Sequence, residues 1–228
     1  LRAGLADFMQ TLYTHVQEKY DNVAVSIDVY AGAGTGKTIW DIAAIEPHTD
    51  HFVVMAYDFH RRQSVSAGPV APLFGGKEYW DTDISVQLQA FLSVVPAHKI
   101  ILGVPFYGYE WQTVSRDSQS HTFPNTGATA TFQRVQELLT QVTTKGVQEH
   151  WNEAALSPYI SYEENGEIYV IYYENSRSLS YKLDYVNQLD LAGIAIWALG
   201  YEGDSRELWE VIERKLQPSK SIYPSLDN

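Results

Sequence analysis

The chain has 228 residues, of which 45% are hydrophobic and 13% aromatic, so it is long enough to bury one substantial core, or one core and a small satellite. Its net charge is -12, and its few, scattered Lys and Arg residues do not form the basic stripe that nucleic-acid binding requires. It contains no Cys, which excludes disulfides, zinc-thiolate sites and cysteine nucleophiles. Its longest apolar runs fall far short of a membrane span. We therefore expect no nucleic-acid or membrane partner, and neither a metal nor a cofactor.

The first part of the chain alternates helical and strand patterns. Apolar residues at helical spacing predict an amphipathic helix over residues 5–18, and the apolar run at 23–30 predicts a strand. A glycine-rich loop follows, and then we expect a short helix over 40–46 and a second strand over 51–58.

The same alternation continues toward the C-terminus. A loop rich in Gly and Pro at 66–77 precedes a helix that we expect to begin at Thr82. The remaining expected elements of this part are a strand over 99–109, a helix over 178–188, a strand over 193–200 and a helix over 205–215. Alternating strands and helices predict a parallel α/β sheet with right-handed crossovers.

Residues 112–176 interrupt this alternation after the third strand. A helical pattern near 132–142 is followed by two β-rich runs, 158–162 and 167–173, on either side of Asn165-Gly166. That arrangement predicts an antiparallel hairpin. We interpret 112–176 as a small α+β insertion into an α/β domain made of 1–111 and 177–216, with 217–228 as a C-terminal tail.

One predicted strand ends in two polar residues that suit a functional site. The apolar run that begins at His51 ends in Tyr57 and Asp58. Ligands in parallel α/β folds bind at the carboxyl ends of the strands. We therefore expect Tyr57 and Asp58 to belong to the site, and we interpret His60, Arg61 and Arg62, which follow them, as solvated loop charges.

The ends of three predicted strands resemble one enzyme family. Met55-Ala56-Tyr57-Asp58, the run Gly103–Gly108 and the run Gly193–Trp197 are similar to the sixth, seventh and eighth barrel strands of family 18 glycoside hydrolases. The Ser157-Pro158-Tyr159 run, the turn from Glu174 to Ser178 and the ending Trp197-Ala198-Leu199-Gly200 resemble a bacterial branch related to spore-cortex and cell-wall glycosidases. The resemblance implies strands five to eight, the C-terminal half, of a (β/α)8 TIM barrel.

This resemblance also implies a reaction and its residues. Family 18 enzymes hydrolyse β-1,4-linked N-acetylglucosamine-containing glycans, such as chitin or peptidoglycan, by a retaining mechanism in which the substrate's own acetamido oxygen is the nucleophile. By resemblance, Tyr57 and Asp58 orient and stabilise the acetamido group. The implied substrate-binding residues are Met55, Tyr107, Tyr109, Trp111 and Trp197. A secreted, cell-wall or spore-associated location is favoured by the same resemblance.

The family's acidic motif is missing from the chain. No Asp-x-x-Asp-x-Asp-x-Glu pattern occurs in the sequence, and the first residue is Leu1 rather than Met. We expect that strands one to four, with the general acid, lie in a longer protein, and that this chain alone is inactive. Half a barrel would expose sheet edges near Val25 and Ile196, so we expect it to pair with the missing N-terminal half or with itself.

Two other functions remain as alternatives. The chain would be a non-catalytic carbohydrate-binding or interaction remnant if no acid-bearing segment accompanies it. Separately, the run Ala31–Thr38 ends in Gly-Lys-Thr after a strand, which approaches the nucleotide-binding P-loop. Against the P-loop, Pro47 soon interrupts the long helix that such a loop should begin.

Overall fold

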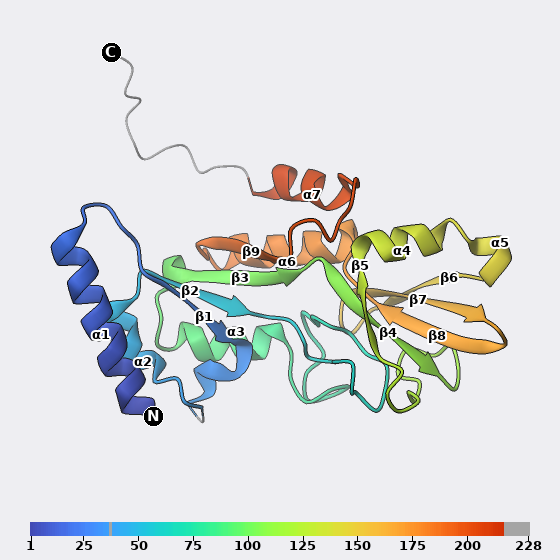
Figure 1. Cartoon of the computed structure of the whole chain (residues 1–228), viewed down its shortest axis with the longest axis horizontal. Helices are drawn as coiled ribbons and strands as arrows, with labels where there is room; N and C mark the ends of the chain where they lie inside the picture. Colours follow the sequence, from blue (N-terminus) through green and yellow to red (C-terminus); the bar gives the residue numbers. More distant parts are fainter. Residues whose placement is uncertain (37, 217–228) are drawn as a thin grey trace, which may run out of the picture.

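The parallel sheet predicted from the sequence is present. The computed structural model describes residues 1–36 and 38–216. Four strands, β1 (Ser26–Tyr30), β2 (His51–Met55), β3 (Ile100–Pro105) and β9 (Gly193–Trp197), form one sheet in the order β1-β2-β3-β9, and every pair is parallel (Figure 1). In this sheet, β1 and β9 are the edge strands.

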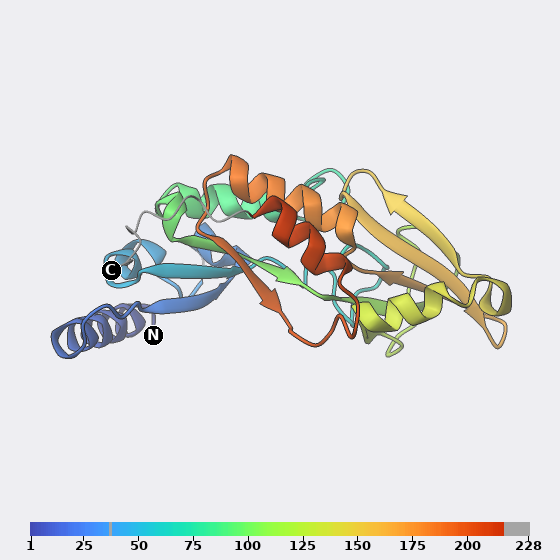
Figure 2. The same cartoon turned by 90° about the horizontal axis from the view of Figure 1, so that it is seen from above.

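Helices precede, connect and follow these strands, as the alternation predicted. They are α1 (Arg2–Lys19), α2 (Ile42–Ile45), α3 (Ile84–Leu92), α6 (Ser176–Gln188) and α7 (Glu207–Lys215), with short 3-10 turns at Ala31–Thr35, Glu46–His48 and Ala97–Lys99. The Asp83 carboxylate caps α3 by accepting from the Val86 amide at 2.8 Å. Figure 2 shows α6 and α7 lying side by side. Among the described helices, none is long and apolar enough to cross a membrane.

The core lies between the sheet and these helices. Val29, Phe52, Val54 and Leu102 point from the strands into it and are fully buried, as is Phe91 from α3. Successive side chains of a strand point to opposite faces. In β1 and β2, the residues that alternate with these buried ones therefore face the other side of the sheet, and they are only partly buried or exposed.

The glycine-rich segment packs against α3 and does not form a P-loop. Residues Ala31–Thr35 form a 3-10 turn, and the next helix is the single turn Ile42–Ile45. A Cβ added to Gly34 would lie 2.9 Å from the Phe91 ring, so this glycine permits close approach to α3. Lys37 of the Gly-Lys-Thr run lies outside the described residues. Since a P-loop begins a helix directly after its glycines, the structure argues against the nucleotide-binding alternative.

A second, antiparallel sheet lies beside the first along the long axis of the molecule (Figure 1). Its strands are β4 (Tyr107–Thr113), β5 (Ala128–Thr131), β6 (Gln148–Asn152), β7 (Ser157–Glu164) and β8 (Glu167–Tyr172), in the order β5-β4-β8-β7-β6. Two short helices, α4 (Phe132–Leu139) and α5 (Val142–Lys145), accompany it.

The chain passes from one sheet to the other at Phe106. Its amide donates to the Trp197 carbonyl at 2.8 Å, and its carbonyl accepts from the Phe132 amide at 3.0 Å. The strand predicted over 99–109 is therefore two strands, β3 and β4. The antiparallel sheet begins at Tyr107, a few residues before the start expected for the insertion at 112.

The hairpin predicted at Asn165-Gly166 is confirmed. β7 and β8 pair in register up to Glu164 opposite Glu167, which leaves a two-residue turn. Asn165 has φ 53° and Gly166 has φ 81°, and positive φ at both positions is the requirement of the type I′ turn.

Replacing Gly166 by Ala is expected to lower the free energy of unfolding by about 1 kcal/mol. No heavy atom lies within 4 Å of a Cβ added at Gly166. The loss of stability would therefore come only from the cost of holding Ala at a positive φ, and not from a steric clash. Urea denaturation of both proteins measures it. Asn165→Gly, which keeps a residue tolerant of positive φ, is the control and should change stability by much less. A Gly166→Ala variant as stable as the parent would contradict this assignment of the turn.

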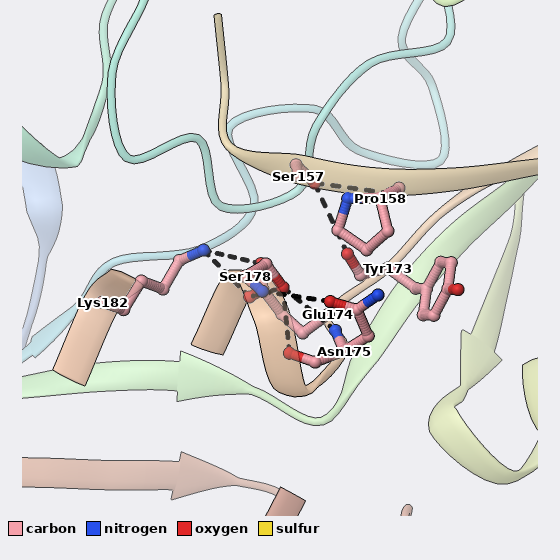
Figure 3. Close-up of polar contacts among 7 residues, drawn as sticks. All are labelled: Ser157, Pro158, Tyr173, Glu174, Asn175, Ser178 and Lys182. Atoms are coloured by element: carbon pink, nitrogen blue, oxygen red, sulfur yellow. Dashed lines mark hydrogen bonds and ion pairs between the residues drawn. The ribbon is translucent and has the colours of Figure 1, made fainter. Parts of the chain in front are cut away.

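A buried ion pair joins the end of β8 to α6 (Figure 3). Lys182 Nζ lies 2.8 and 2.9 Å from the two carboxylate oxygens of Glu174, and both side chains are at most 1% exposed. The Ser178 hydroxyl donates to the same carboxylate at 2.8 Å, and Asn175 caps α6 by accepting from the Ser178 amide at 3.0 Å. The turn from Glu174 to Ser178 therefore fixes where α6 begins relative to the second sheet.

Candidate active site

Tyr57 and Asp58 lie at the carboxyl end of the parallel sheet, where the sequence placed them. They directly follow β2, whose residues Phe52 and Val54 are buried in the core together with Ala56. Because side chains alternate along a strand, Met55 and Tyr57 lie on the opposite, partly exposed side.

Asp58 is held by hydrogen bonds from two tyrosines of β4. Its Oδ1 accepts from the Tyr107 hydroxyl at 2.5 Å and from the Tyr109 hydroxyl at 2.9 Å. Asp58 has φ 64°, a conformation that Asp tolerates better than most residues. Its carbonyl accepts from Arg61 Nε at 3.0 Å. Within residues 1–36 and 38–216, Oδ2 receives no hydrogen bond, so this oxygen remains available to a ligand.

The surrounding tyrosines keep their protons. Burial, followed by the negative charges of Asp58 and Asp28, raises the pKa of Tyr57 to about 12. Burial and donation to Asp58 raise the pKa of Tyr109 to about 12, and the same causes raise the pKa of Tyr107 well above its usual range. All three hydroxyls are therefore hydrogen-bond donors near neutral pH.

Two adjoining cavities open at this position. The smaller has a volume of about 300 Å³ and the larger about 640 Å³. The residues that line both are Tyr30, Met55, Tyr57, Asp58 and Arg61. The smaller cavity is completed by Tyr107, Tyr109, Thr129, Trp197 and Tyr201, and the larger one extends to His60, Tyr79, Trp80 and Gln119.

Trp197 is an exposed aromatic side chain on the smaller cavity. It is the last residue of β9, and 57% of its surface is exposed. A large aromatic face left open at a cavity is a binding surface for an apolar face of a ligand. Trp197 therefore presents an exposed aromatic face to this cavity.

Trp111 differs from the sequence-based expectation. It is fully buried and lines neither cavity. Its indole N–H donates to the Arg61 carbonyl at 3.1 Å, and its ring packs against Tyr109. Trp111 therefore supports the loop after Asp58 from beneath, and a substrate would not touch it. Glu110, which lies between Tyr109 and Trp111 on β4, points to Tyr162 and Arg134 instead of the cavity.

Several cavity residues were not predicted. Tyr30 ends β1 and lies beside the end of β2, since Tyr30 pairs with Met55, so the strand-end rule that found Tyr57 would also have found it. Thr129 belongs to β5, a strand without an apolar run, and Tyr201 follows β9. No local pattern signals these two. Arg61 lines both cavities, although the sequence suggested only a solvated loop charge.

The site contains no cluster suited to a metal. In the part of the chain that the structure describes, no group of three or more His, Asp or Glu side chains is arranged to hold a metal ion. What the site offers instead is one carboxylate oxygen of Asp58, the Tyr57 hydroxyl, the exposed Trp197 indole and the Arg61 guanidinium, because the Tyr107 and Tyr109 hydroxyls already donate to Asp58. Such a set suits a ligand rich in hydroxyl and amide groups.

The chain is similar to known proteins over most of its length. An uncharacterized glycosylase, YvbX, of Bacillus subtilis is 27% identical over 218 residues, which cover 93% of this chain and 57% of that protein. Chitinase B of Serratia marcescens is 27% identical over 58% of this chain and 31% of its own length. The sequence pattern of the family described as Glycosyl hydrolases family 18 matches residues 2–202.

Solved structures show the same fold. A chitinase from Chromobacterium violaceum superposes with a TM-score of 0.75 at 24% identity, covering 94% of this chain and 61% of that one. A chitinase from Cycas revoluta, solved in complex with (GlcNAc)4, gives a TM-score of 0.80 at 20% identity and covers 94% and 63%. The chain thus spans about three fifths of the length of these structures and of YvbX. Since the family match covers most of its residues, the chain belongs to the glycosyl hydrolases of family 18.

Proposed function

We propose that this chain is the C-terminal half, strands five to eight, of a (β/α)8 barrel that hydrolyses β-1,4-linked N-acetylglucosamine-containing glycans. The observation that carries the proposal is the Asp58 carboxylate, with one oxygen held by Tyr107 and Tyr109 and the other available beside Tyr57. Family membership and the chitinases solved with N-acetylglucosamine oligomers support it.

The geometry fits a substrate-assisted reaction. The acetamido oxygen of the sugar attacks its anomeric carbon as the glycosidic C–O bond breaks, giving a cyclic oxazolinium ion, and water then opens the ring with retention. Positive charge develops on the acetamido group during the first step. Asp58 Oδ2 accepts the acetamido N–H and balances this charge, and the Tyr57 hydroxyl donates to the acetamido oxygen and holds it for attack.

Other side chains that line the smaller cavity supply the rest of the sugar site. The open face of Trp197 stacks beneath the C–H-lined face of the pyranose ring. Met55, Tyr107 and Tyr109 line the same cavity. Tyr107 and Tyr109 act on the substrate through Asp58, because their hydroxyls point to its carboxylate.

The leaving oxygen needs a proton, and we propose that its donor belongs to a separate segment. No Asp-x-x-Asp-x-Asp-x-Glu pattern occurs in the 228 residues, so the chain alone is expected to bind glycans without cleaving them. The two edge strands, β1 and β9, are where an N-terminal half-barrel would pair. Self-association through the same edges is the alternative.

One experiment separates these possibilities. The 228-residue chain and the same chain joined behind its acid-bearing segment are compared for binding and for hydrolysis of chitotetraose. Binding by both with hydrolysis only by the joined protein supports the proposal. Binding without hydrolysis in either form identifies a carbohydrate-binding remnant, whereas hydrolysis by the isolated chain, or no binding by either, contradicts the proposal.

Replacing Trp197 by Ala is expected to weaken chitotetraose binding about tenfold, because removal of the stacking face loses roughly 1.4 kcal/mol of aromatic contact and burial. Titration calorimetry measures the change. Leu199→Ala is the matched control, since Leu199 is 69% exposed near the same strand end but lines neither cavity. Equal losses in the two variants would show that Trp197 has no specific role.

A further inference from the structure

Arg61 occupies a central place in the site. It is the one Lys or Arg side chain that lines either cavity in the described part of the chain, and it lines both. The other residues shared by the two cavities include Tyr57 and Asp58, the proposed acetamido-binding pair. A group bound by Arg61 would therefore lie next to the acetamido group of the sugar.

The position of Arg61 is fixed by hydrogen bonds despite its exposure. Its amide donates to the Ser64 hydroxyl at 2.9 Å, and its carbonyl accepts from the Ser64 amide at 3.0 Å and from the Trp111 indole at 3.1 Å. Its side chain is held by donation from Nε to the Asp58 carbonyl at 3.0 Å. Because the Arg61 side chain is already restrained, it loses less conformational entropy when a ligand binds, and the free-energy cost of binding is lower.

The charge of Arg61 is left without a protein partner. In the described part of the chain, no carboxylate lies within 4.0 Å of its guanidinium nitrogens, and neither Nη group donates a hydrogen bond. The protein has 28 acidic and 16 basic residues. Among the described residues, Arg61 therefore has no carboxylate partner even though acidic residues outnumber basic ones in this chain. Two parallel N–H donors on a planar group match a carboxylate.

We propose that Arg61 binds a carboxylate carried by the glycan, so that the preferred substrate is an acetamido-sugar polymer with acidic substituents instead of neutral chitin. The 3-O-lactyl group of N-acetylmuramic acid in peptidoglycan is such a substituent, and it bears a free carboxylate once its peptide has been removed. This inference rests on the proposed function and specifies its substrate class. A reaction that hydrolyses the lactyl amide bond would supply this substrate.

The negative groups in the site set a limit on this recognition. Asp58 and Asp81 also line the larger cavity, and the whole protein is acidic, so a negatively charged glycan is repelled at long range. Salt screens such long-range repulsion, whereas a hydrogen-bonded guanidinium–carboxylate contact is screened less. Selectivity for the acidic glycan therefore has to come from the direct contact with Arg61.

The test compares two oligosaccharides of equal length. One is chitotetraose, and the other alternates N-acetylglucosamine with N-acetylmuramic acid bearing free lactyl carboxylates. We expect the 228-residue chain to bind the acidic oligosaccharide about tenfold more tightly, in line with a charged hydrogen-bonded pair. Conversion of the lactyl carboxylates to methylamides is expected to abolish the preference.

The ratio of the two affinities is the decisive quantity, because Arg61 also holds the Asp58 carbonyl and its loss can weaken both ligands. Arg61→Gln is expected to bring the ratio to about one, and Arg61→Lys, which lacks the two-pronged geometry, to keep only part of it. Arg62→Gln is the matched control. Arg62 is exposed, donates to Thr129 at 2.7 Å and lines neither cavity, so its loss should leave the ratio unchanged.

Three results would overturn the inference: equal affinity of the parent chain for both oligosaccharides, an undiminished preference in Arg61→Gln, or an equal loss of preference in Arg62→Gln. None of these contradicts the proposed function, because both ligands still bind. Failure to bind either oligosaccharide contradicts the proposed function itself.

Discussion

Asp58→Asn, introduced into the chain joined to its acid-bearing segment, is expected to lower kcat by about 10²–10³-fold. The amide keeps the shape of the carboxylate, and its oxygen can still accept from Tyr107 and Tyr109. It has no negative charge to balance the positive acetamido group. The effect should therefore fall on kcat more than on KM, because that charge develops only as the reaction proceeds.

The matched control for this variant is Asp190→Asn. Asp190 also has a left-handed backbone, with φ 54°, and lines neither cavity, so the change removes the same charge from the same type of backbone. Its turnover should match that of the parent enzyme. Near-normal turnover of Asp58→Asn would disprove the role assigned to Asp58, and chitotetraose hydrolysis followed under saturating substrate provides the measurement.

Lys182→Met is expected to lower the free energy of unfolding by about 3–5 kcal/mol, because it leaves the buried Glu174 carboxylate without its counter-charge. Burial already raises the pKa of Glu174 despite the opposing effect of Lys182. In the variant this pKa rises further, so the folded protein binds more protons than the unfolded chain. Stability therefore increases as the pH falls through the raised pKa, and the deficit relative to the parent should be smaller in acid.

Urea denaturation at several pH values measures this deficit. The double variant Glu174→Gln/Lys182→Met removes both charges and is expected to be more stable than Lys182→Met alone at neutral pH. If Lys182→Met is as stable as the parent, or if its loss of stability grows in acid, then Lys182 and Glu174 do not form the buried pair of opposite charges assigned to them. Lys215→Met is a suitable control, because its partner Asp184 is at the surface and such pairs contribute little.

The sequence predicted the parts of the fold that depend on local pattern. β2 and β3 have apolar runs, α6 and α7 have helical periodicity, and Asn165-Gly166 requires a particular turn, so each could be predicted without knowledge of its neighbours. β5 and β6 were missed because Ala128–Thr131 and Gln148–Asn152 contain no apolar run. They are strands because β4 and β7 pair with them.

The same distinction holds within the site. Tyr57 and Asp58 could be placed at a strand end from the sequence, and the family resemblance placed Trp197 beside them. The sequence could not predict which of the neighbouring side chains face the cavity. Trp111 lies two residues after Tyr109 on β4, yet it is fully buried because the loop around Arg61 covers it.

The sequence by itself determined the alternation of strands and helices and the strand end that carries Tyr57 and Asp58, because these follow from short-range spacing. The family was inferred from the resemblance of three strand ends to known glycoside hydrolases. Tertiary structure alone decided which oxygen of Asp58 is free and which cation lines the cavities. The first feature depends on contacts of Asp58 with Tyr107 and Tyr109, 49 and 51 residues away in the sequence. The second depends on a loop whose Arg61 carbonyl accepts from the Trp111 indole, 50 residues away. Local propensity does not predict such contacts, because they form only when the two sheets pack together.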